Sequence, residues 1–210
     1  MTVAAIITLL EQIEGSDRLF NPYRDHDPAL ESADAPEIRR ANLTLYLQAM
    51  QVRRPRVMWL AEAMSRRGAR RTGLPLTGDR MLLPLATRLK MVVPFRHPTA
   101  QHDDPGSVTA RAIWEAMPDD VPLLWNAVMQ VPHRSAPDYA IRTPSAPEIR
   151  ANLAVLAALA AMFAPQKILC IGRVAERCAQ PVGVSLTYVR HPAQGGLSAF
   201  REGCTTFLSS

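Results

Sequence analysis

The 210-residue sequence predicts an α/β fold, a three-layer sandwich with a central, mainly parallel sheet of about four strands. Three observations lead to this prediction. Short β-rich runs recur along the chain and are apolar on successive residues, as strands covered on both faces should be. Segments with helical spacing of apolar residues stand between these runs. A chain that alternates strand, crossover helix and strand in this way forms parallel pairs with helices on both faces.

Four segments are predicted to be the strands of this sheet. They are Arg56–Ala61, Pro122–Ala127, Lys167–Ile171 and Val184–Val189. In open parallel sheets, ligands bind beyond the carboxyl ends of the strands. We therefore expect the functional residues in the segments that directly follow these four strands.

Two helices begin with nearly the same sequence, DAPEIRRANL from Asp34 and SAPEIRANL from Ser145. Each start combines a capping side chain, a proline and a glutamate three residues after the cap, which is the pattern of a helix N-terminus. We interpret the likeness as shared capping chemistry, because the flanking sequences show no longer repeat. Further helices are predicted over Val3–Ile13, Val108–Met117, Arg173–Ala179 and Gly196–Phe207.

Length and composition favour one domain that covers residues 1–210, because 48% apolar residues suffice for one buried core while the chain is short for two. The three cysteines, Cys170, Cys178 and Cys204, form no C-x-x-C pair, which indicates neither a disulfide framework nor a zinc or iron–sulfur site. We therefore expect no metal and no cofactor. The apolar runs are shorter than a membrane span requires, so we expect no membrane partner and a cytoplasmic location.

The charge balance is moderately basic. Lys and Arg number 24 against 19 Asp and Glu, which gives a net charge of +5 and is compatible with a polyanionic partner. Four arginines, Arg66, Arg67, Arg70 and Arg71, cluster around Gly68. Guanidinium groups offer forked donors that suit phosphate, so this segment is a candidate phosphate-binding loop. The alternative interpretation is an ordinary solvated loop.

The ends of the predicted strands carry a small set of chemically capable side chains. Glu62 follows the first strand, Asn126 and His133 lie at and after the end of the second, and His191 follows the fourth. We expect them to converge on one cleft. These segments contain no lysine suited to a Schiff base, no G-x-G-x-x-G motif and no Walker loop, and Ser65 lacks the glycines of a nucleophile elbow. Dinucleotide, phosphoryl-transfer and α/β-hydrolase functions are therefore disfavoured.

Five segments, in chain order, resemble motifs of one known family. FNPY occupies residues 20–23. AEAMSRRGARRTGLPLT, at 61–77, is similar to G-E-A-P-G-x-x-G-x-x-x-T-G-I-P-F-T. LLWNAVMQVPHR, ILCIGRVAER and VRHPAQGG are similar to W-N-A-F-P-x-H-P-H, V-G-R-x-A-x-R and H-P-S-x-G-G, respectively. Because five ordered matches are hard to obtain by chance, the sequence is identified as a divergent member of the uracil-DNA glycosylase superfamily, whose fold it is expected to share.

The resemblance implies a monofunctional, metal-independent and monomeric DNA glycosylase, associated with the nucleoid. Such an enzyme flips uracil, or a related deaminated base, out of DNA and hydrolyses its N-glycosidic bond, which starts base excision repair. By the resemblance, His191 donates a hydrogen bond to the uracil O2, Asn126 reads the base edge, and Glu62 orients water or stabilises the cationic sugar. The alternatives are a capping or packing role for His191, a turn-stabilising amide for Asn126, and an ion pair of Glu62 with Arg66 or Arg67.

The sequence departs from the family pattern at several positions. Leu76 stands where the family has a phenylalanine that stacks on the flipped base, and the exchange gives up about 1–3 kcal/mol of stacking free energy, so we expect weaker base binding. Gln194 and Gly195 occupy the place where relatives carry a bulky wedge, which makes both candidate DNA contacts. Ala193 replaces a serine that would touch phosphate, and Val131 replaces the first histidine of the second motif.

The first motif is altered around Glu62. Ala61 and Ser65 stand for glycines and Met64 for a proline, so we expect a reshaped approach of the backbone to the sugar. Two function classes therefore remain open, an active glycosylase and a catalytically weakened DNA- or base-binding module on the same scaffold. A hydrolase of small nucleosides is a third class, but it would not need a basic loop. The preferred base and the preference for single or double strands stay open.

Overall fold

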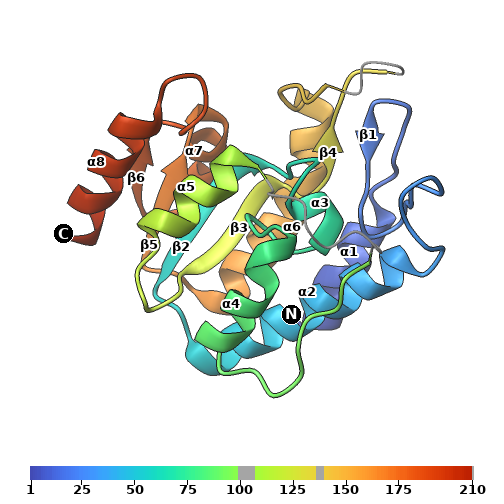
Figure 1. Ribbon diagram of the computed structural model, residues 1–210. Helices are drawn as coiled ribbons and strands as arrows, with labels where there is room; N and C mark the ends of the chain where they lie inside the picture. The colour runs from blue at the N-terminus through green and yellow to red at the C-terminus, as the bar shows by residue number, and fades with distance from the viewer. Residues whose placement is uncertain (99–106, 136–139, 210) are drawn as a thin grey trace.

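The central sheet contains four parallel strands (Figure 1). In the computed structural model, which describes residues 1–98, 107–135 and 140–209, these strands pair in the order β3-β2-β5-β6. Their bounds are Leu123–Val128 for β3, Val57–Ala63 for β2, Lys167–Ile171 for β5 and Ser185–Val189 for β6. The predicted parallel sheet is confirmed. The boundaries of β2, β3 and β6 differ from the predicted ones by one or two residues. The largest difference is at β2, which extends two residues beyond the predicted end and so includes Glu62.

Helices occupy all six predicted places. They are α1 (Val3–Gln12), α2 (Ala35–Arg53), α5 (Val108–Ala116), α6 (Ala146–Phe163), α7 (Arg173–Ala179) and α8 (Leu197–Leu208). Short helices that the sequence pattern did not predict are α3 (Ala69–Thr72), α4 (Leu82–Arg88) and the 3-10 turns η1 (Asp79–Met81) and η2 (Gln180–Val182). These four are too short to show helical periodicity over more than two turns.

The two similar helix starts are capped differently. At α6, the Ser145 backbone N–H donates to Glu148 Oε2 at 2.6 Å, and the two residues form the predicted capping box. At α2, the Asp34 side chain makes no capping hydrogen bond and instead accepts one from the Ser32 hydroxyl. Similar sequences at these two sites therefore produce the same element through different contacts.

A second, two-stranded sheet was not predicted. In it, β1 (Leu19–Phe20) pairs antiparallel with β4 (Val131–Pro132), directly after β3. A strand of two residues leaves no alternation for sequence patterning to detect. The pairing brings the N-terminal segment beside the carboxyl end of the central sheet, where Figure 1 shows β1 and β4 standing together.

Helices cover both faces of the central sheet. Right-handed crossovers with this strand order place α6 and α7 on one face and α4 and α5 on the other, and in Figure 1 α5 crosses in front of the sheet while α6 lies behind it. Trp59 and Trp125 are buried in the core. Within the described residues, α6 alone is long and apolar enough to cross a membrane by composition, and here it packs on α1 and β3.

Two close contacts fix helices α2 and α8 against the sheet. The Tyr46 hydroxyl of α2 accepts from the Leu124 N–H at 2.7 Å and donates to the Leu124 carbonyl oxygen at 3.3 Å. On α8, a Cβ at Gly203 would lie 2.6 Å from a methyl group of Val189, so this helix approaches β6 more closely than any other residue would permit. These contacts hold the sheet whose carboxyl ends form the site.

Candidate active site

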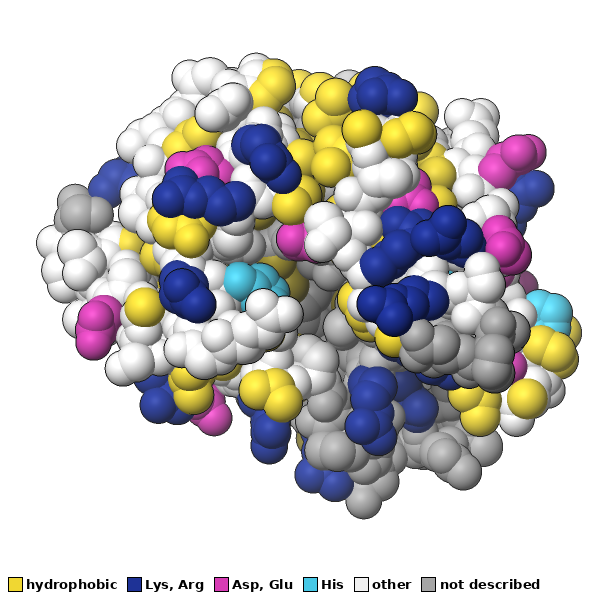
Figure 2. Space-filling model, turned by 90° about the horizontal axis from the view of Figure 1, so that it is seen from above, with side chains coloured by type: hydrophobic (Ala, Val, Ile, Leu, Met, Phe, Trp, Pro, Cys, Tyr) yellow, Lys and Arg dark blue, Asp and Glu magenta, His cyan; other side chains and the backbone are white. Residues whose placement is uncertain are grey.

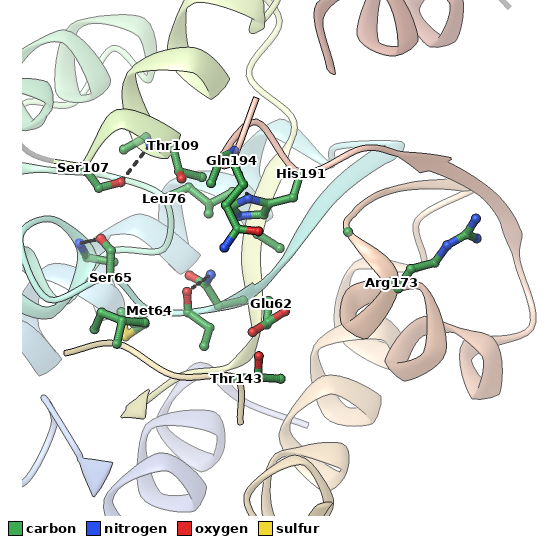
Figure 3. A pocket seen from close by; sticks show the side chains of 18 of the residues that line it. Glu62, Met64, Ser65, Leu76, Ser107, Thr109, Thr143, Arg173, His191 and Gln194 are labelled. Carbon is green, nitrogen blue, oxygen red and sulfur yellow. Dashed lines mark hydrogen bonds between the residues drawn. The ribbon is translucent and has the colours of Figure 1, made fainter. Parts of the chain in front are cut away.

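A cavity of about 660 Å³ opens at the carboxyl ends of the four strands. It brings together Glu62 from β2, Asn126 from β3 and His191 from the segment after β6, which the sequence placed in one cleft (Figure 3). In the space-filling view of Figure 2, a hollow has a histidine on its wall and Lys and Arg side chains on both sides. These three converge as predicted, whereas His133, expected in the same cleft, is buried outside the cavity lining with its Nδ1 2.8 Å from the Arg134 carbonyl oxygen. The roles assigned to these residues stay predictions.

The Asn126 carboxamide is buried and only half satisfied. Its side chain is 1% exposed, and its amide nitrogen donates to the Ala63 carbonyl oxygen at 2.9 Å. This bond fixes which end of the amide is oxygen, and that oxygen has no hydrogen-bond partner within the described residues. A buried acceptor without a partner costs free energy of about 1–3 kcal/mol. The cavity therefore contains an acceptor that a ligand N–H group would satisfy.

The His191 ring is held in one tautomer. Its Nδ1 accepts a hydrogen bond from the Ala193 backbone N–H at 3.2 Å, so in the neutral imidazole the proton is on Nε2. Burial lowers the pKa of His191 below its usual value of 6.5, which keeps the ring neutral at pH 7. Gly172, with a φ of +94°, packs against the ring from the end of β5. His191 therefore presents an uncharged N–H donor on a supported ring.

The Glu62 carboxylate is half-buried on the cavity wall. Burial raises the pKa of Glu62 above its usual value of 4.5, and the positive charge of Arg177 partly opposes this shift. No hydrogen bond or ion pair of Glu62 occurs within the described part of the chain. The predicted alternative, in which Glu62 pairs with Arg66 or Arg67, finds no support in these contacts. Glu62 can therefore act on a ligand or on water.

Leu76 lines the cavity in an unusual backbone conformation. It has a φ of +56°, in the left-handed region that side chains with a Cβ rarely adopt, and it is 6% exposed. The Trp114 indole N–H donates to the Leu76 carbonyl oxygen at 3.1 Å, so a half-buried side chain of α5 holds this turn. The aliphatic side chain faces the cavity at the place predicted for a base-stacking group. Met64 and Ser65 also line the cavity (Figure 3).

The loop after His191 is built from two successive left-handed residues. Gln194 has a φ of +54° and Gly195 a φ of +75°. Gln194 lines the cavity, and Figure 3 shows its side chain extending into it, whereas Gly195 lies outside the lining residues. A Cβ at Gly196 would lie 2.1 Å from the His191 carbonyl oxygen, so only glycine fits there. The tight fold of this loop positions both His191 and Gln194.

Two of the four arginines predicted to bind phosphate are paired with carboxylates of the protein itself. Arg70 is buried, and its Nη2 lies 3.3 Å from Glu31 and 3.4 Å from Asp27. Arg71 pairs with the buried Asp79 at 2.6 Å. Charged groups are buried only with partners, and these partners turn Arg70 and Arg71 away from solvent. Sequence alone could not reveal this, because Glu31 and Asp27 come from a distant segment and Asp79 comes from a short turn without a periodic pattern.

Arg66 and Arg67 are the two exposed arginines of this cluster. They precede α3 and directly follow Ser65 of the cavity wall. The two therefore remain candidates for phosphate contact.

The FNPY segment serves the fold rather than the cavity. Asn21 donates from its amide nitrogen to the carbonyl oxygens of Leu10 and Ile13, at 2.7 and 2.6 Å, and so ends α1. The Tyr23 hydroxyl donates to the Gly73 carbonyl oxygen at 2.8 Å. The Arg70 guanidinium stacks on Phe20, 4.2 Å from the ring centroid. This segment therefore ties the N-terminus to the loop that follows β2.

Several cavity residues were not singled out from the sequence. They are Ser107, Thr109, Ile141, Arg142, Thr143, Arg173, Tyr188 and Arg190. Arg173 and Arg190 directly follow β5 and β6, so the rule that ligands lie beyond strand ends could have found them. Thr143 comes from the segment before α6 and has no such signal. Its neighbour Arg142 anchors that segment by pairing with Glu148, at 2.9 and 2.5 Å, and lowers the pKa of Glu148 to about 2.

The cavity residues suit an organic ligand with a polar edge. Asn126 offers an acceptor, His191 a neutral donor, and Glu62 a carboxylate, on walls that otherwise include Leu76 and Met64. Among the described residues, no group of three His, Cys, Asp or Glu side chains gathers as a metal site would require.

Comparison with known proteins identifies the fold. No family model matches the sequence, and no curated protein matches it. The solved structure of wild-type Pedobacter heparinus SMUG2 matches with a TM-score of 0.60 and 12% sequence identity, over 100% of this chain and 96% of that chain. SMUG2 is a member of the uracil-DNA glycosylase superfamily. The chain described here therefore has the uracil-DNA glycosylase-like α/β fold, a four-stranded parallel sheet flanked by helices.

Proposed function

We propose that this protein is a DNA glycosylase that binds uracil, or a related deaminated base, in the cavity and hydrolyses its N-glycosidic bond. The observation that carries the proposal is the buried Asn126 oxygen without a partner, which lies in the same cavity as Glu62 and His191. The uracil-DNA glycosylase-like fold and the sequence motifs support the same reaction class.

Base recognition would use the two ends of the Asn126 amide. Deaminated bases carry an N–H beside a carbonyl oxygen, and cytosine lacks this N–H in its normal form. The Asn126 oxygen accepts from the base N–H, while the amide hydrogen not used by Ala63 can donate to the neighbouring carbonyl oxygen. A base without this N–H would leave the Asn126 oxygen unsatisfied, which gives discrimination against undamaged cytosine.

Bond cleavage would use His191 and Glu62 at opposite ends of the charge separation. As the bond between the base nitrogen and C1′ breaks, its electron pair moves to the base, which becomes an anion, and the sugar becomes cationic. The His191 Nε2–H donates to the base oxygen that bears the new charge. The Glu62 carboxylate stabilises the sugar cation or orients the attacking water. Water adds to C1′, and the proton it loses neutralises the base anion, directly or through solvent, which leaves an abasic site and the free base.

A catalytically weakened binding module is the second candidate. The observation that favours it is Leu76, an aliphatic side chain in a left-handed turn where stacking on a base would call for an aromatic ring. Such a protein would bind DNA through Arg66 and Arg67 and hold a base without releasing it.

An excision assay separates the candidates. Oligonucleotides that contain one uracil, hypoxanthine or xanthine are incubated with the protein, and alkali then cleaves any abasic site. The glycosylase predicts strand cleavage at the deaminated base, and much slower cleavage in His191→Ala. Binding without cleavage of any of the three substrates would support the module instead. Hydrolysis of free nucleosides at least as fast as of DNA would support neither.

A further inference from the structure

Two stacked side chains lie on the rim of the cavity. The Arg173 guanidinium carbon lies 3.7 Å from the centroid of the Tyr188 ring. Arg173 begins α7 directly after β5, Tyr188 lies in β6, and both line the cavity. Figure 3 shows the Arg173 side chain pointing away from the centre of the cavity and from His191. The stack therefore lies beside the position of a bound base rather than against it.

The Arg173 guanidinium is oriented yet keeps unused donors. Its Nη1 donates to Glu176 Oε2 at 2.8 Å, and the stack on Tyr188 fixes the plane of the group. The side chain is 67% exposed, and within the described residues its Nε and Nη2 have no hydrogen-bond partner. These two nitrogens form one forked edge of the guanidinium, which matches two oxygens of a phosphate group. An oriented arginine also loses less side-chain entropy on binding than a mobile one.

Arg190 adds a second positive charge at the same side of the cavity. It directly follows β6, is exposed and lines the cavity. Arg66 and Arg67 stand on a different segment, after β2. Figure 2 accordingly shows Lys and Arg side chains on both sides of the hollow. A strand that places one base in the cavity carries its phosphates across the rim on both sides of that nucleotide.

We infer that Arg173 and Arg190 bind a phosphodiester of the DNA strand next to the nucleotide whose base enters the cavity. This subsite rests on the proposed function, because it assumes a DNA strand at the rim. Arg173 supplies the forked edge to the phosphate, and Arg190 supplies a second charge. Tyr188 is a positioning residue that holds the Arg173 plane without touching DNA.

Binding to DNA with single neutral phosphates tests the subsite. The probe contains one 2′-fluoro-deoxyuridine, which resists hydrolysis, and a methylphosphonate replaces each flanking phosphate in turn. Wild-type protein should lose about fivefold in affinity at one flanking position, as for one exposed charged contact. Arg173→Ala should bind the unmodified probe about fivefold more weakly and lose less affinity than wild type at that position, where Arg190 alone still contributes charge.

Arg201→Ala is the matched control. Arg201 is 56% exposed and pairs with Glu115 at 2.8 Å, as Arg173 pairs with Glu176, but it lies on α8 outside the cavity lining. This variant should retain the wild-type response at every position. Tyr188→Phe keeps the stack and should also behave as wild type, whereas Tyr188→Leu should lose part of the affinity at the same single phosphate.

The outcomes separate the subsite from the proposed function. If every methylphosphonate lowers the affinity of Arg173→Ala by the same factor as it lowers that of wild type, the subsite is overturned, even if uracil is excised. If the effect of one methylphosphonate is smaller in Arg173→Ala than in wild type, but the protein releases no base, the result supports the subsite and contradicts the glycosylase. Failure of wild-type protein to bind the probe would overturn both.

Discussion

The Asn126 amide nitrogen donates to the Ala63 carbonyl oxygen at 2.9 Å, across the β2–β3 pair, and the amide oxygen is left buried in the cavity without a partner. A buried acceptor without a partner costs free energy, and this one lies in the cavity lining. Its position suits a ligand that carries an N–H group.

Replacing Asn126 by Ala should weaken excision more than it weakens the fold. We expect kcat/KM for uracil release to fall by about tenfold to a hundredfold, since hydrogen bonds to the base edge are lost. Asn152→Ala is the control, because Asn152 bonds to Met129, Gln130 and Glu148 inside the protein. The control should lower the melting temperature more than Asn126→Ala does. A larger fall in melting temperature for Asn126→Ala than for Asn152→Ala would assign Asn126 a structural role.

Glu62→Gln should stabilise the protein at neutral pH. Burial raises the folded-state pKa of Glu62 above 4.5, so the folded protein binds this proton more tightly than the unfolded chain. The resulting stability is present below the unfolded pKa and is lost as pH rises through the folded pKa. The melting temperature of Glu62→Gln should therefore exceed that of wild type at about pH 7, and the gap should close near pH 4. An equal gap at both pH values would contradict the raised pKa.

The pH profile of excision should depend on the same carboxylate. If the ionised form of Glu62 assists the reaction, kcat/KM rises with pH through the raised pKa of Glu62. In Glu62→Gln the rate should be low and this rise should be absent. Exposed Glu202 on α8 provides the control, since Glu202→Gln should keep the wild-type profile. An unchanged acid limb in Glu62→Gln would assign the ionisation to another group.

The four arginines of the 66–71 segment should separate into two classes. Arg66→Ala combined with Arg67→Ala should reduce the slope of log affinity against log salt by about 2, because about one counterion is released per phosphate contact. Arg70→Ala should instead destabilise the fold by about 3 kcal/mol in urea unfolding, because it leaves Glu31 and Asp27 with less compensating charge. If Arg70→Ala is as stable as wild type but binds DNA more weakly, Arg70 contacts DNA, as predicted for all four arginines.

Leu76→Phe should strengthen base binding. The aromatic ring would supply a stacking surface worth about 1–3 kcal/mol without altering Glu62, Asn126 or His191. We expect a lower KM for a uracil-containing oligonucleotide, measured beside Leu76→Met, which keeps a flexible apolar side chain without a ring. Equal KM values in the two variants would show that the position does not contact the base.

The sheet and the strand-end residues could be predicted because both depend on local patterns. Runs such as residues 168–171 are apolar at every position, and parallel topology then places Glu62, Asn126 and His191 at one edge. The partners of Arg70 and Arg71 could not be predicted, because Glu31 and Asp79 come from segments with no periodic signal. The orientation of the Asn126 amide could not be predicted either, because it is set by a hydrogen bond to the Ala63 carbonyl oxygen across the β2–β3 pair.

The positions of Arg142, Thr143 and Arg173 at the cavity also depend on contacts that the sequence pattern does not show. Arg142 and Thr143 reach the cavity because the β1–β4 pair and the bridge between His133 and Ile141 fold their segment over the end of the sheet. These pairings are too short for a sequence pattern to indicate. Arg173 was within reach of prediction as the residue that follows β5, but its stack on Tyr188 depends on the register of β5 against β6.

The single-turnover rate of uracil release by wild type and His191→Ala tests the central proposal most directly. With protein in excess over a uracil-containing oligonucleotide, wild type should release the base. His191→Ala should be slower by on the order of 10²-fold at unchanged DNA affinity, the effect expected for losing one oriented donor at the oxygen that becomes charged. Release at the wild-type rate by His191→Ala, or no release by wild type from any deaminated substrate, would contradict the proposed reaction.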